Sequence, residues 1–314
     1  MKRILFTLIL AAGLTWSGPA RAEAPLTLML DWFPNVDHLP VYVAQQRGYF
    51  SEQGVSVKIL SPSDTADALK LAAAGKVDLA VSYEPQTVIA ASRGIDVRVV
   101  GRLIEHPLTT LLFLKSAGFT APADLNGRTI GYTVPGLMDV LMDAFARVNG
   151  IKDYQLVNVG FSIVPALSAG RVDAVMGPFK TYETVTMAAE GLEAGFFELE
   201  RWGIPDYDEL VFICGAQTLA GKKKQVKGFV QAVARGIDAV AASPDEALAD
   251  YFKAVPDADR AVETAAFGLT RPYYASGQAC DPVRWQAFAD FALKHGLIEK
   301  PVAVAPLLPD LNAD

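Results

Sequence analysis

Short apolar segments alternate with segments of helical periodicity along most of the chain. In the first third, these patterns predict, in chain order, a strand at 26–30, a helix at 41–50, a strand at 55–60, a helix at 63–75, a strand at 77–81, a helix at 83–93 and a strand at 97–104. Strands that alternate with helices form a largely parallel sheet covered by helices on both faces. The pattern therefore predicts an α/β fold.

The same alternation begins again after residue 107. The elements predicted there are strands at 108–114, 129–132, 156–159 and 172–176 and helices at 136–148, 162–169 and 181–190. A further strand at 209–214 precedes an almost wholly helical remainder. The helix that follows Lys222 carries one apolar stripe, formed by Val226, Phe229, Val230, Val233, Ile237 and Val240. This stripe predicts packing against a core rather than a free-standing helix.

Two tandem lobes account for this repetition and for a length that exceeds what one core usually holds. The expected division is a leader at 1–22, the first part of lobe 1 at 23–105, lobe 2 at 106–206, and a return to lobe 1 with C-terminal helices at 207–314. The crossovers near 104–107 and 203–207 are expected to act as a hinge.

The N-terminus has the pattern of a secretory signal peptide. Met1-Lys2-Arg3 leads into an apolar run from Ile4 to Trp16, and Ala20-x-Ala22 provides small residues for cleavage near Ala22. A buried helix would need polar residues spaced along one face, and this run has only threonines at two positions. We therefore expect a protein that works outside the cytoplasm after its leader is removed.

Composition narrows the class of partner. The 314 residues include 28 basic and 35 acidic ones, a net charge of −7, and removal of the leader takes away three more positive charges. Phosphate binding needs the opposite excess, so nucleic acid is not an expected partner. Cys214 and Cys280 could form a disulfide in an oxidising compartment, but a large core does not need that link, so two buried thiols are the expectation.

The residues offer little for catalysis. The chain has three histidines and contains no Gly-rich phosphate loop, Cys-x-x-Cys or His-Glu-x-x-His motif. We therefore predict no catalytic residues, no metal site and no cofactor.

Candidate binding residues follow the predicted strands, where α/β sheets bind ligands. After the first strand come Trp32, whose indole can stack on a ring, and Asn35 and His38, which can donate or accept hydrogen bonds. The other candidates at strand ends are Tyr83, Glu84, Tyr132, Thr133 and Gly136. The alternatives are core filling for the indole, helix-dipole compensation for the acid at 84, and an ordinary turn at 132–136.

Several segments, taken in order, resemble the thiamine pyrimidine-precursor family, which holds bacterial solute-binding proteins and the fungal pyrimidine synthase. They are Leu30-Asp31-Trp32-Phe33-Pro34-Asn35 with His38, Ala44-Gln45-Gln46-Arg47-Gly48-Tyr49-Phe50, Gly75-Lys76-Val77-Asp78, Ser82-Tyr83-Glu84-Pro85 and Gly203-Ile204-Pro205-Asp206-Tyr207-Asp208-Glu209-Leu210. The resemblance implies a hinge-linked, two-lobed type II periplasmic binding protein fold with the ligand cleft between the lobes. It also implies a monomer that binds a small heteroaromatic ligand and delivers it to an inner-membrane ABC permease with a cytoplasmic ATPase.

By this resemblance, Trp32 and Tyr83 stack on a pyrimidine, Asn35 hydrogen-bonds it, and Glu183 accepts protons from an aminopyrimidine edge. The expected ligand is a thiamine pyrimidine precursor such as formylaminopyrimidine or hydroxymethylpyrimidine. The synthase branch carries a cysteine cluster before the strand that holds Cys214, and it carries a histidine where this chain has Gln86. This chain has neither feature, so a binding protein is expected rather than an enzyme. Thr133-Val134-Pro135-Gly136-Leu137 also departs from the family pattern, which leaves riboflavin or a sulfonate as alternative ligands.

Overall fold

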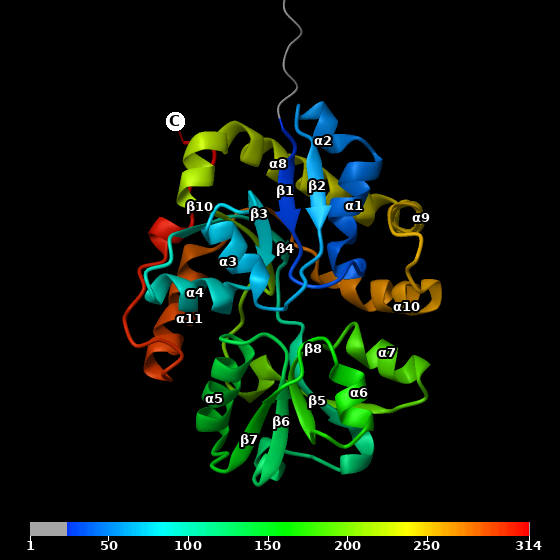
Figure 1. Ribbon diagram of the computed structural model, residues 1–314, viewed down its shortest axis with the longest axis vertical. Helices are drawn as coiled ribbons and strands as arrows, with labels where there is room; N and C mark the ends of the chain where they lie inside the picture. Colours follow the sequence, from blue (N-terminus) through cyan, green and yellow to red (C-terminus); the bar gives the residue numbers. More distant parts are fainter. Residues whose placement is uncertain (1–23, 314) are drawn as a thin grey trace, which may run out of the picture.

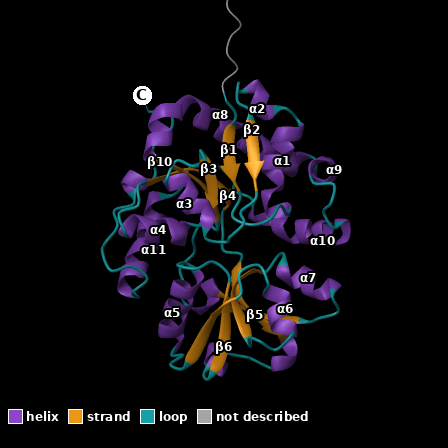
Figure 2. Cartoon of the chain, viewed as in Figure 1, coloured by secondary structure: helices purple, strands orange, loops and turns teal. Residues whose placement is uncertain are grey.

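The computed structural model describes residues 24–313, so the predicted signal peptide at 1–22 lies outside the described residues. The chain forms two lobes stacked along the long axis, each built around a five-stranded sheet with helices on both faces (Figures 1 and 2). The lobes are joined where the chain passes from one sheet to the other. We call the sheet of the chain's first strands lobe 1 and the other lobe 2.

The lobe 1 sheet mixes strand directions. Its strands are, in order across the sheet, β2 (Val57–Leu60), β1 (Leu26–Met29), β3 (Leu79–Ser82), β10 (Leu210–Gly215) and β4 (Val97–Ile104). β1 is parallel to both of its neighbours, whereas β10 is antiparallel to both β3 and β4. The sheet is thus largely parallel, as predicted, with one reversed strand.

The lobe 2 sheet repeats this arrangement. Its strands are, in order, β7 (Tyr154–Asn158), β6 (Arg128–Tyr132), β8 (Ala174–Phe179), β5 (Thr109–Leu114) and β9 (Ala194–Glu198). Here β5 is the reversed strand, antiparallel to β8 and β9. Both reversed strands come directly after the chain has crossed from the opposite lobe. Each lobe therefore contributes one strand whose direction is set by the crossover.

Helices cover the sheets, and the C-terminal helices return to lobe 1. In lobe 1 the helices are α1 (Leu39–Gln46), α2 (Tyr49–Glu52), α3 (Asp67–Ala73), α4 (Glu84–Ser92), α8 (Ala216–Ala242), α9 (Pro244–Ala254), α10 (Arg260–Thr270) and α11 (Pro282–Lys294). In lobe 2 they are α5 (Met138–Asn149), α6 (Ile163–Ser168) and α7 (Glu183–Ala189). α8 packs on α1, β4 and β10, and α11 packs on α4 (Figure 1).

The element boundaries differ from the prediction in a few places. The helix expected at 41–50 is divided into α1 and α2 because Gly48 adopts a left-handed conformation with φ 74°. β9 was not predicted, and α8 begins at Ala216, before the predicted start, with a kink at Lys222. Cys214 is buried, Cys280 is half-buried and both are free thiols, so the disulfide alternative is not present in the structure.

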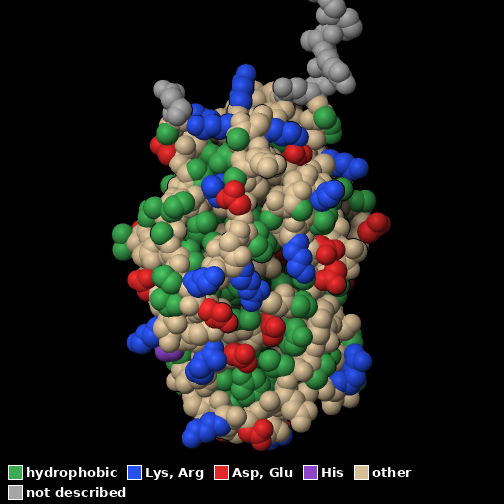
Figure 3. All heavy atoms as spheres, turned by 60° about the vertical axis from the view of Figure 1, so that its left-hand side comes forward, with side chains coloured by type: hydrophobic (Ala, Val, Ile, Leu, Met, Phe, Trp, Pro, Cys, Tyr) green, Lys and Arg blue, Asp and Glu red, His purple; other side chains and the backbone are tan. Residues whose placement is uncertain are grey.

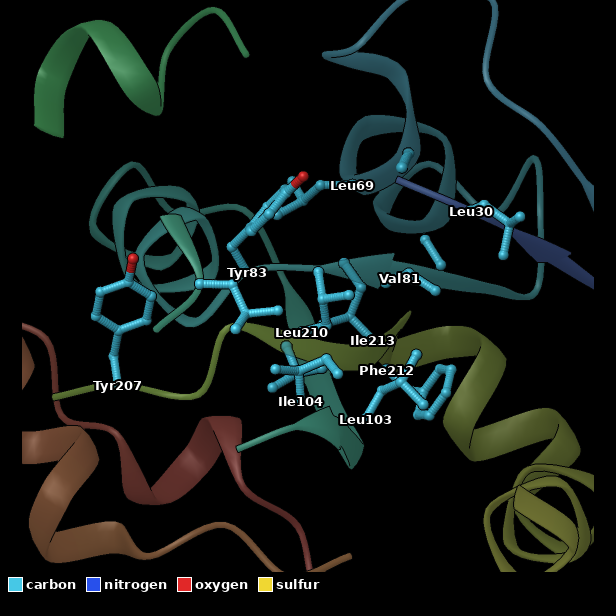
Figure 4. Close-up of a cluster of buried hydrophobic side chains, with 14 of the residues drawn as sticks. Leu30, Leu69, Val81, Tyr83, Leu103, Ile104, Tyr207, Leu210, Phe212 and Ile213 are labelled. Atoms are coloured by element: carbon cyan, nitrogen blue, oxygen red, sulfur yellow. The ribbon is translucent and has the colours of Figure 1, made fainter. Parts of the chain in front are cut away.

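The core of lobe 1 centres on β10 and β4. Figure 4 shows Leu103 and Ile104 of β4 beside Leu210, Phe212 and Ile213 of β10. All five residues are fully buried. Burial of apolar surface on this scale is the main favourable term in folding. The reversed strand of lobe 1 is therefore buried along its whole length.

The two crossovers are tied together by buried carboxylates. Glu209 accepts hydrogen bonds from the backbone N–H groups of Leu108 (2.6 Å) and Thr109 (2.7 Å). Next to it, the Asp208 carboxylate accepts the indole N–H of Trp285 at 2.7 Å and pairs with Arg102 at 3.3 Å. Because Trp285 belongs to α11, the last helix of the chain is attached to the connection between the lobes.

The surface has a mixed charge pattern. On the face shown in Figure 3, basic and acidic side chains are interspersed with hydrophobic ones and do not form a large patch of one sign. None of the helices within residues 24–313 combines the length and apolar character needed to cross a bilayer.

We predict that Trp285→Phe lowers the free energy of unfolding by about 1–3 kcal/mol. The phenyl ring retains most of the apolar packing, but Asp208, which is 0% exposed, loses the indole donor. Denaturant unfolding measures the change. Trp202→Phe is the control, because Trp202 is only half-buried and its indole N–H makes no hydrogen bond to another described residue. Equal losses in the two variants would contradict the assigned role of the Asp208 contact.

Candidate functional site

A cavity lies between the lobes, at the carboxyl ends of β1, β3, β6 and β8. The residues that line it are Asp31, Trp32, Asn35, Asp37, Tyr83, Thr133, Ile163, Gly177, Phe179, Tyr182 and Glu183. Lobe 1 provides the loop after β1 and the residue after β3, and lobe 2 provides the residue after β6 and the end of β8 with the start of α7. Both lobes therefore contribute to a single site, at the position where α/β sheets bind ligands.

The loop after β1 is held by its own polar side chains. Asn35 precedes a short 3₁₀ turn (Val36–His38) and caps it, because its Oδ1 accepts the N–H of Asp37 at 2.8 Å. One oxygen of Asp31 lies 2.9 Å from Nε2 of His38, and the other accepts the Tyr83 hydroxyl at 2.7 Å. His38 and Tyr83 thus fix the Asp31 carboxyl, and this arrangement orients the loop toward the cavity.

Two other carboxyl groups at the cavity hold protons more tightly than usual. Burial raises the pKa of Asp37 to about 8, and the nearby charges of Glu183 and Asp31 add to this effect, whereas His38 opposes it. Burial also raises the pKa of Glu183 to about 7, although this carboxyl accepts the N–H of Phe179 at 2.6 Å. Among the described residues, no Lys or Arg lines the cavity. The site is acidic and offers hydrogen-bond acceptors.

Aromatic rings from both lobes meet at the cavity. Trp32 of lobe 1 packs against Phe161 of lobe 2, with ring centroids 4.5 Å apart, and Phe33 lies 6.1 Å from Tyr182. Trp32 belongs to an apolar cluster whose other buried members, including Ile163 and Leu167, all come from lobe 2. Its Nε1–H is buried and has no hydrogen-bond partner among the described residues. The indole therefore joins the lobes while leaving one donor unused.

The cavity is narrow in this conformation. It encloses about 350 Å³ of space, including space open to solvent, of which only about 20 Å³ can hold the centre of a water molecule. That smaller volume suffices for about one water. A planar ring would therefore enter only after the lobes or their aromatic side chains had moved apart.

Gly177 allows a close approach between strands at the cavity wall. Its φ is 124°, a conformation that other residues rarely adopt, and a Cβ atom there would lie 2.1 Å from Oγ1 of Thr133. Thr133 in turn accepts, through its carbonyl oxygen, a 2.7 Å hydrogen bond from the Thr65 hydroxyl of lobe 1. This glycine makes room for a contact between the lobes.

Five of the residues proposed from the sequence come together at the cavity: Trp32, Asn35, Tyr83, Thr133 and Glu183. The other four lie elsewhere. His38 lies behind Asp31, and Glu84 accepts the N–H of Asp208 at 2.7 Å in the second crossover. Tyr132 ends β6 and packs against the large apolar core. Gly136 donates its N–H to Asp139 within lobe 2.

Six residues that line the cavity were not predicted from the sequence: Asp31, Asp37, Ile163, Gly177, Phe179 and Tyr182. Two of these had a usable signal. Asp31 and Asp37 belong to the loop that also holds Trp32 and Asn35, and acids at the end of a buried strand are candidates for a ligand site. In the part of the chain that the structure describes, no group of three or more His, Cys, Asp or Glu residues is arranged to hold a metal ion.

Comparisons with known proteins point to one family. The model of the NMT1/THI5-like family matches residues 35–247. A putative thiamine biosynthesis protein of Haemophilus influenzae is 36% identical over 308 residues, which are 97% of this chain and 98% of that protein. The formylaminopyrimidine-binding protein of Halalkalibacterium halodurans is 34% identical over 224 residues, 70% of this chain and 68% of that protein.

A more distant relative is an enzyme, and a solved binding protein has a similar fold. The 4-amino-5-hydroxymethyl-2-methylpyrimidine phosphate synthase THI13 of Saccharomyces cerevisiae is 28% identical over 264 residues, 80% of this chain and 77% of the enzyme. The alkanesulfonate-binding protein SsuA from Xanthomonas axonopodis pv. citri, bound to MOPS, superposes with a TM-score of 0.73 at 18% identity, covering 92% of this chain and 99% of that one. The predicted two-lobed periplasmic binding protein fold is thus confirmed.

The raised pKa of Asp37 predicts a pH-dependent stability. The folded protein retains this proton up to about pH 8, whereas the ordinary pKa of a free aspartate side chain is 3.8. The stabilising contribution is therefore complete below about pH 4 and is lost as the pH rises to about 8. Asp37→Asn cannot ionise, so its free energy of unfolding should fall less than that of the wild type between about pH 5 and pH 8, by on the order of 1 kcal/mol or more.

Denaturant unfolding across this pH range measures the two slopes. Asp238→Asn is the control, because Asp238 is an exposed acid on α8. Equal slopes for the wild type and Asp37→Asn would show that the Asp37 carboxyl is not held protonated in the folded protein.

Proposed function

The chain belongs to the NMT1/THI5-like family, and we propose that it binds a thiamine pyrimidine precursor of the formylaminopyrimidine or hydroxymethylpyrimidine type as the solute-binding component of an ABC importer. The ligand is held between the lobes and passed to a membrane permease. The signal-peptide pattern of the N-terminal sequence supports a periplasmic location for this step. The protein itself leaves the ligand chemically unchanged.

The composition of the cavity wall supports this ligand class. Three carboxyl side chains, Asp31, Asp37 and Glu183, line the cavity together with aromatic rings, and no Lys or Arg from the described residues joins them. An aminopyrimidine presents N–H donors along one edge, and carboxyl oxygens accept such donors, in charge-assisted hydrogen bonds where the carboxyl group is ionised. Its flat ring suits the aromatic walls. Its ring nitrogens, or a formyl or hydroxyl oxygen, offer an acceptor for the unused Nε1–H of Trp32.

The same wall disfavours a sulfonate. A sulfonate is an anion, and no Lys or Arg among the described residues lines the cavity to balance its charge. The resemblance to the alkanesulfonate-binding protein is therefore one of fold. This chain lacks the cysteine cluster of the synthase branch and has Gln86 in place of its histidine. An assay for product separates binding from turnover.

Isothermal titration calorimetry with a panel of compounds tests the ligand class. We expect 4-amino-5-hydroxymethyl-2-methylpyrimidine and formylaminopyrimidine to bind, because each combines an N–H donor edge with an acceptor. An alkanesulfonate and riboflavin should give no binding heat under the same conditions. Tight binding of the sulfonate, or formation of a new pyrimidine product by the purified protein supplied with iron, would contradict the proposal.

Glu183→Gln tests the contribution of the carboxylate in lobe 2. A hydrogen bond to a charged acceptor contributes about 1.5–3 kcal/mol, so affinity for the aminopyrimidine should fall roughly 10- to 100-fold. The glutamine oxygen can still accept the N–H of Phe179, which preserves the start of α7. Glu190→Gln is the matched control, since Glu190 is the exposed residue at the end of the same helix. Unchanged affinity in Glu183→Gln would remove this carboxylate from the binding site.

A further inference from the structure

A buried acid outside the ligand cavity joins the two lobes. Glu263 lies in the first turn of α10, whose start is capped by the Asp259 carboxylate through the N–H of Ala261 at 2.9 Å. Glu263 is only 3% exposed. α10 belongs to lobe 1 and packs against both the 3₁₀ turn of the ligand loop and α7 of lobe 2 (Figure 1). Glu263 is thus placed where the two lobes meet.

The two oxygens of this carboxylate serve different lobes. Oε2 accepts the backbone N–H of Val36 at 2.9 Å, within the loop that carries Asn35 and Asp37. Oε1 accepts a 2.9 Å hydrogen bond from the hydroxyl of Tyr182, the residue before Glu183. A single carboxylate therefore fixes the position of the cavity residues of lobe 1 relative to those of lobe 2. Glu263 does not itself line the cavity.

The contact with Tyr182 depends on closure, whereas the contact with Val36 does not. Val36 and Glu263 both belong to lobe 1 and stay together when the lobes separate, but Tyr182 moves with lobe 2. A hydrogen bond present only in the closed conformation shifts the population toward that conformation. Burying a carboxylate without partners is costly. The hydrogen bond from Tyr182, which replaces water on Oε1 of Glu263 when the lobes close, therefore stabilises the closed state.

We propose that Glu263 is a positioning residue that latches the lobes through Tyr182 and so slows release of the bound ligand. The identity of the released ligand rests on the proposed function, whereas the contact between the lobes does not depend on it. The latch acts on the conformation of the protein even in the absence of ligand. It can therefore be tested separately from ligand identity.

The variants are Tyr182→Phe, Glu263→Gln and the double variant. Tyr154→Phe is the matched control, because it also removes a hydroxyl that donates to a carboxylate, that of Asp143 at 2.6 Å, but within lobe 2 alone. Small-angle X-ray scattering of the unliganded proteins reports how open the lobes are. Stopped-flow measurements with 4-amino-5-hydroxymethyl-2-methylpyrimidine give the association and dissociation rates.

We expect a larger unliganded radius of gyration for Tyr182→Phe than for the wild type and Tyr154→Phe. The dissociation rate should rise roughly tenfold with little change in the association rate, because the lost bond is made only after closure. The double variant should dissociate about as fast as the more affected single variant, and more slowly than the product of the two single effects, because both changes break one contact. This non-additivity separates the latch from a direct contact of Tyr182 with the ligand.

Equal radii for the wild type and Tyr182→Phe overturn the latch, whether or not the pyrimidine binds. Fully multiplicative effects on dissociation in the double variant also overturn it, because Glu263 and Tyr182 would then act independently. If the radii differ but the wild type does not bind the pyrimidine, the latch stands and the proposed ligand is wrong. If Glu263→Gln does not fold, the comparison of Tyr182→Phe with Tyr154→Phe still decides.

Discussion

The burial of like-charged groups between the lobes is the constraint on which the site depends. Asp31 and Asp37 come from lobe 1 and Glu183 comes from lobe 2, and all three are at most 8% exposed. Burial raises the pKa values of both Asp37 and Glu183, and for Asp37 the neighbouring acids Glu183 and Asp31 add to this effect. Closing the lobes brings these acids together. Closure therefore needs either retained protons or a ligand that supplies hydrogen-bond donors.

This constraint links the choice of ligand to the conformational change. On the proposed function, the N–H groups of an aminopyrimidine satisfy the carboxylates that otherwise oppose closure, so the ligand binds the closed conformation better than the open one. The aromatic contact between Trp32 and Phe161 and the hydrogen bond from Tyr182 to Glu263 act in the same direction. A ligand that lacks donors would gain the aromatic contacts but leave the acids unsatisfied.

The sequence predicts the fold better than the site. Alternating apolar and helical segments place most strands and helices correctly, because their burial depends on local periodicity. The reversal of β10 and β5 depends on the crossover between lobes, which no local pattern encodes. The site residues directly after strands, Trp32, Asn35 and Tyr83, could be predicted from the rule on strand ends. His38 and Glu84 follow the same rule, yet their side chains turn to Asp31 and to the crossover.

Contacts between distant parts of the chain were beyond sequence reasoning. Glu263 lies 227 positions from Val36, and Trp285 lies 77 positions from Asp208, so spacing gives no indication that they meet. Both Glu263 and Trp285 follow residue 247, where the match to the family model ends. That match covers the residues that line the cavity except Asp31 and Trp32, whereas the C-terminal helices act on the lobe junction and the crossovers. The C-terminal helices thus add two contacts, those of Glu263 and Trp285, from outside the cavity wall, so on the proposed latch a substitution at Glu263 in α10 alters ligand release without removing a residue that lines the cavity.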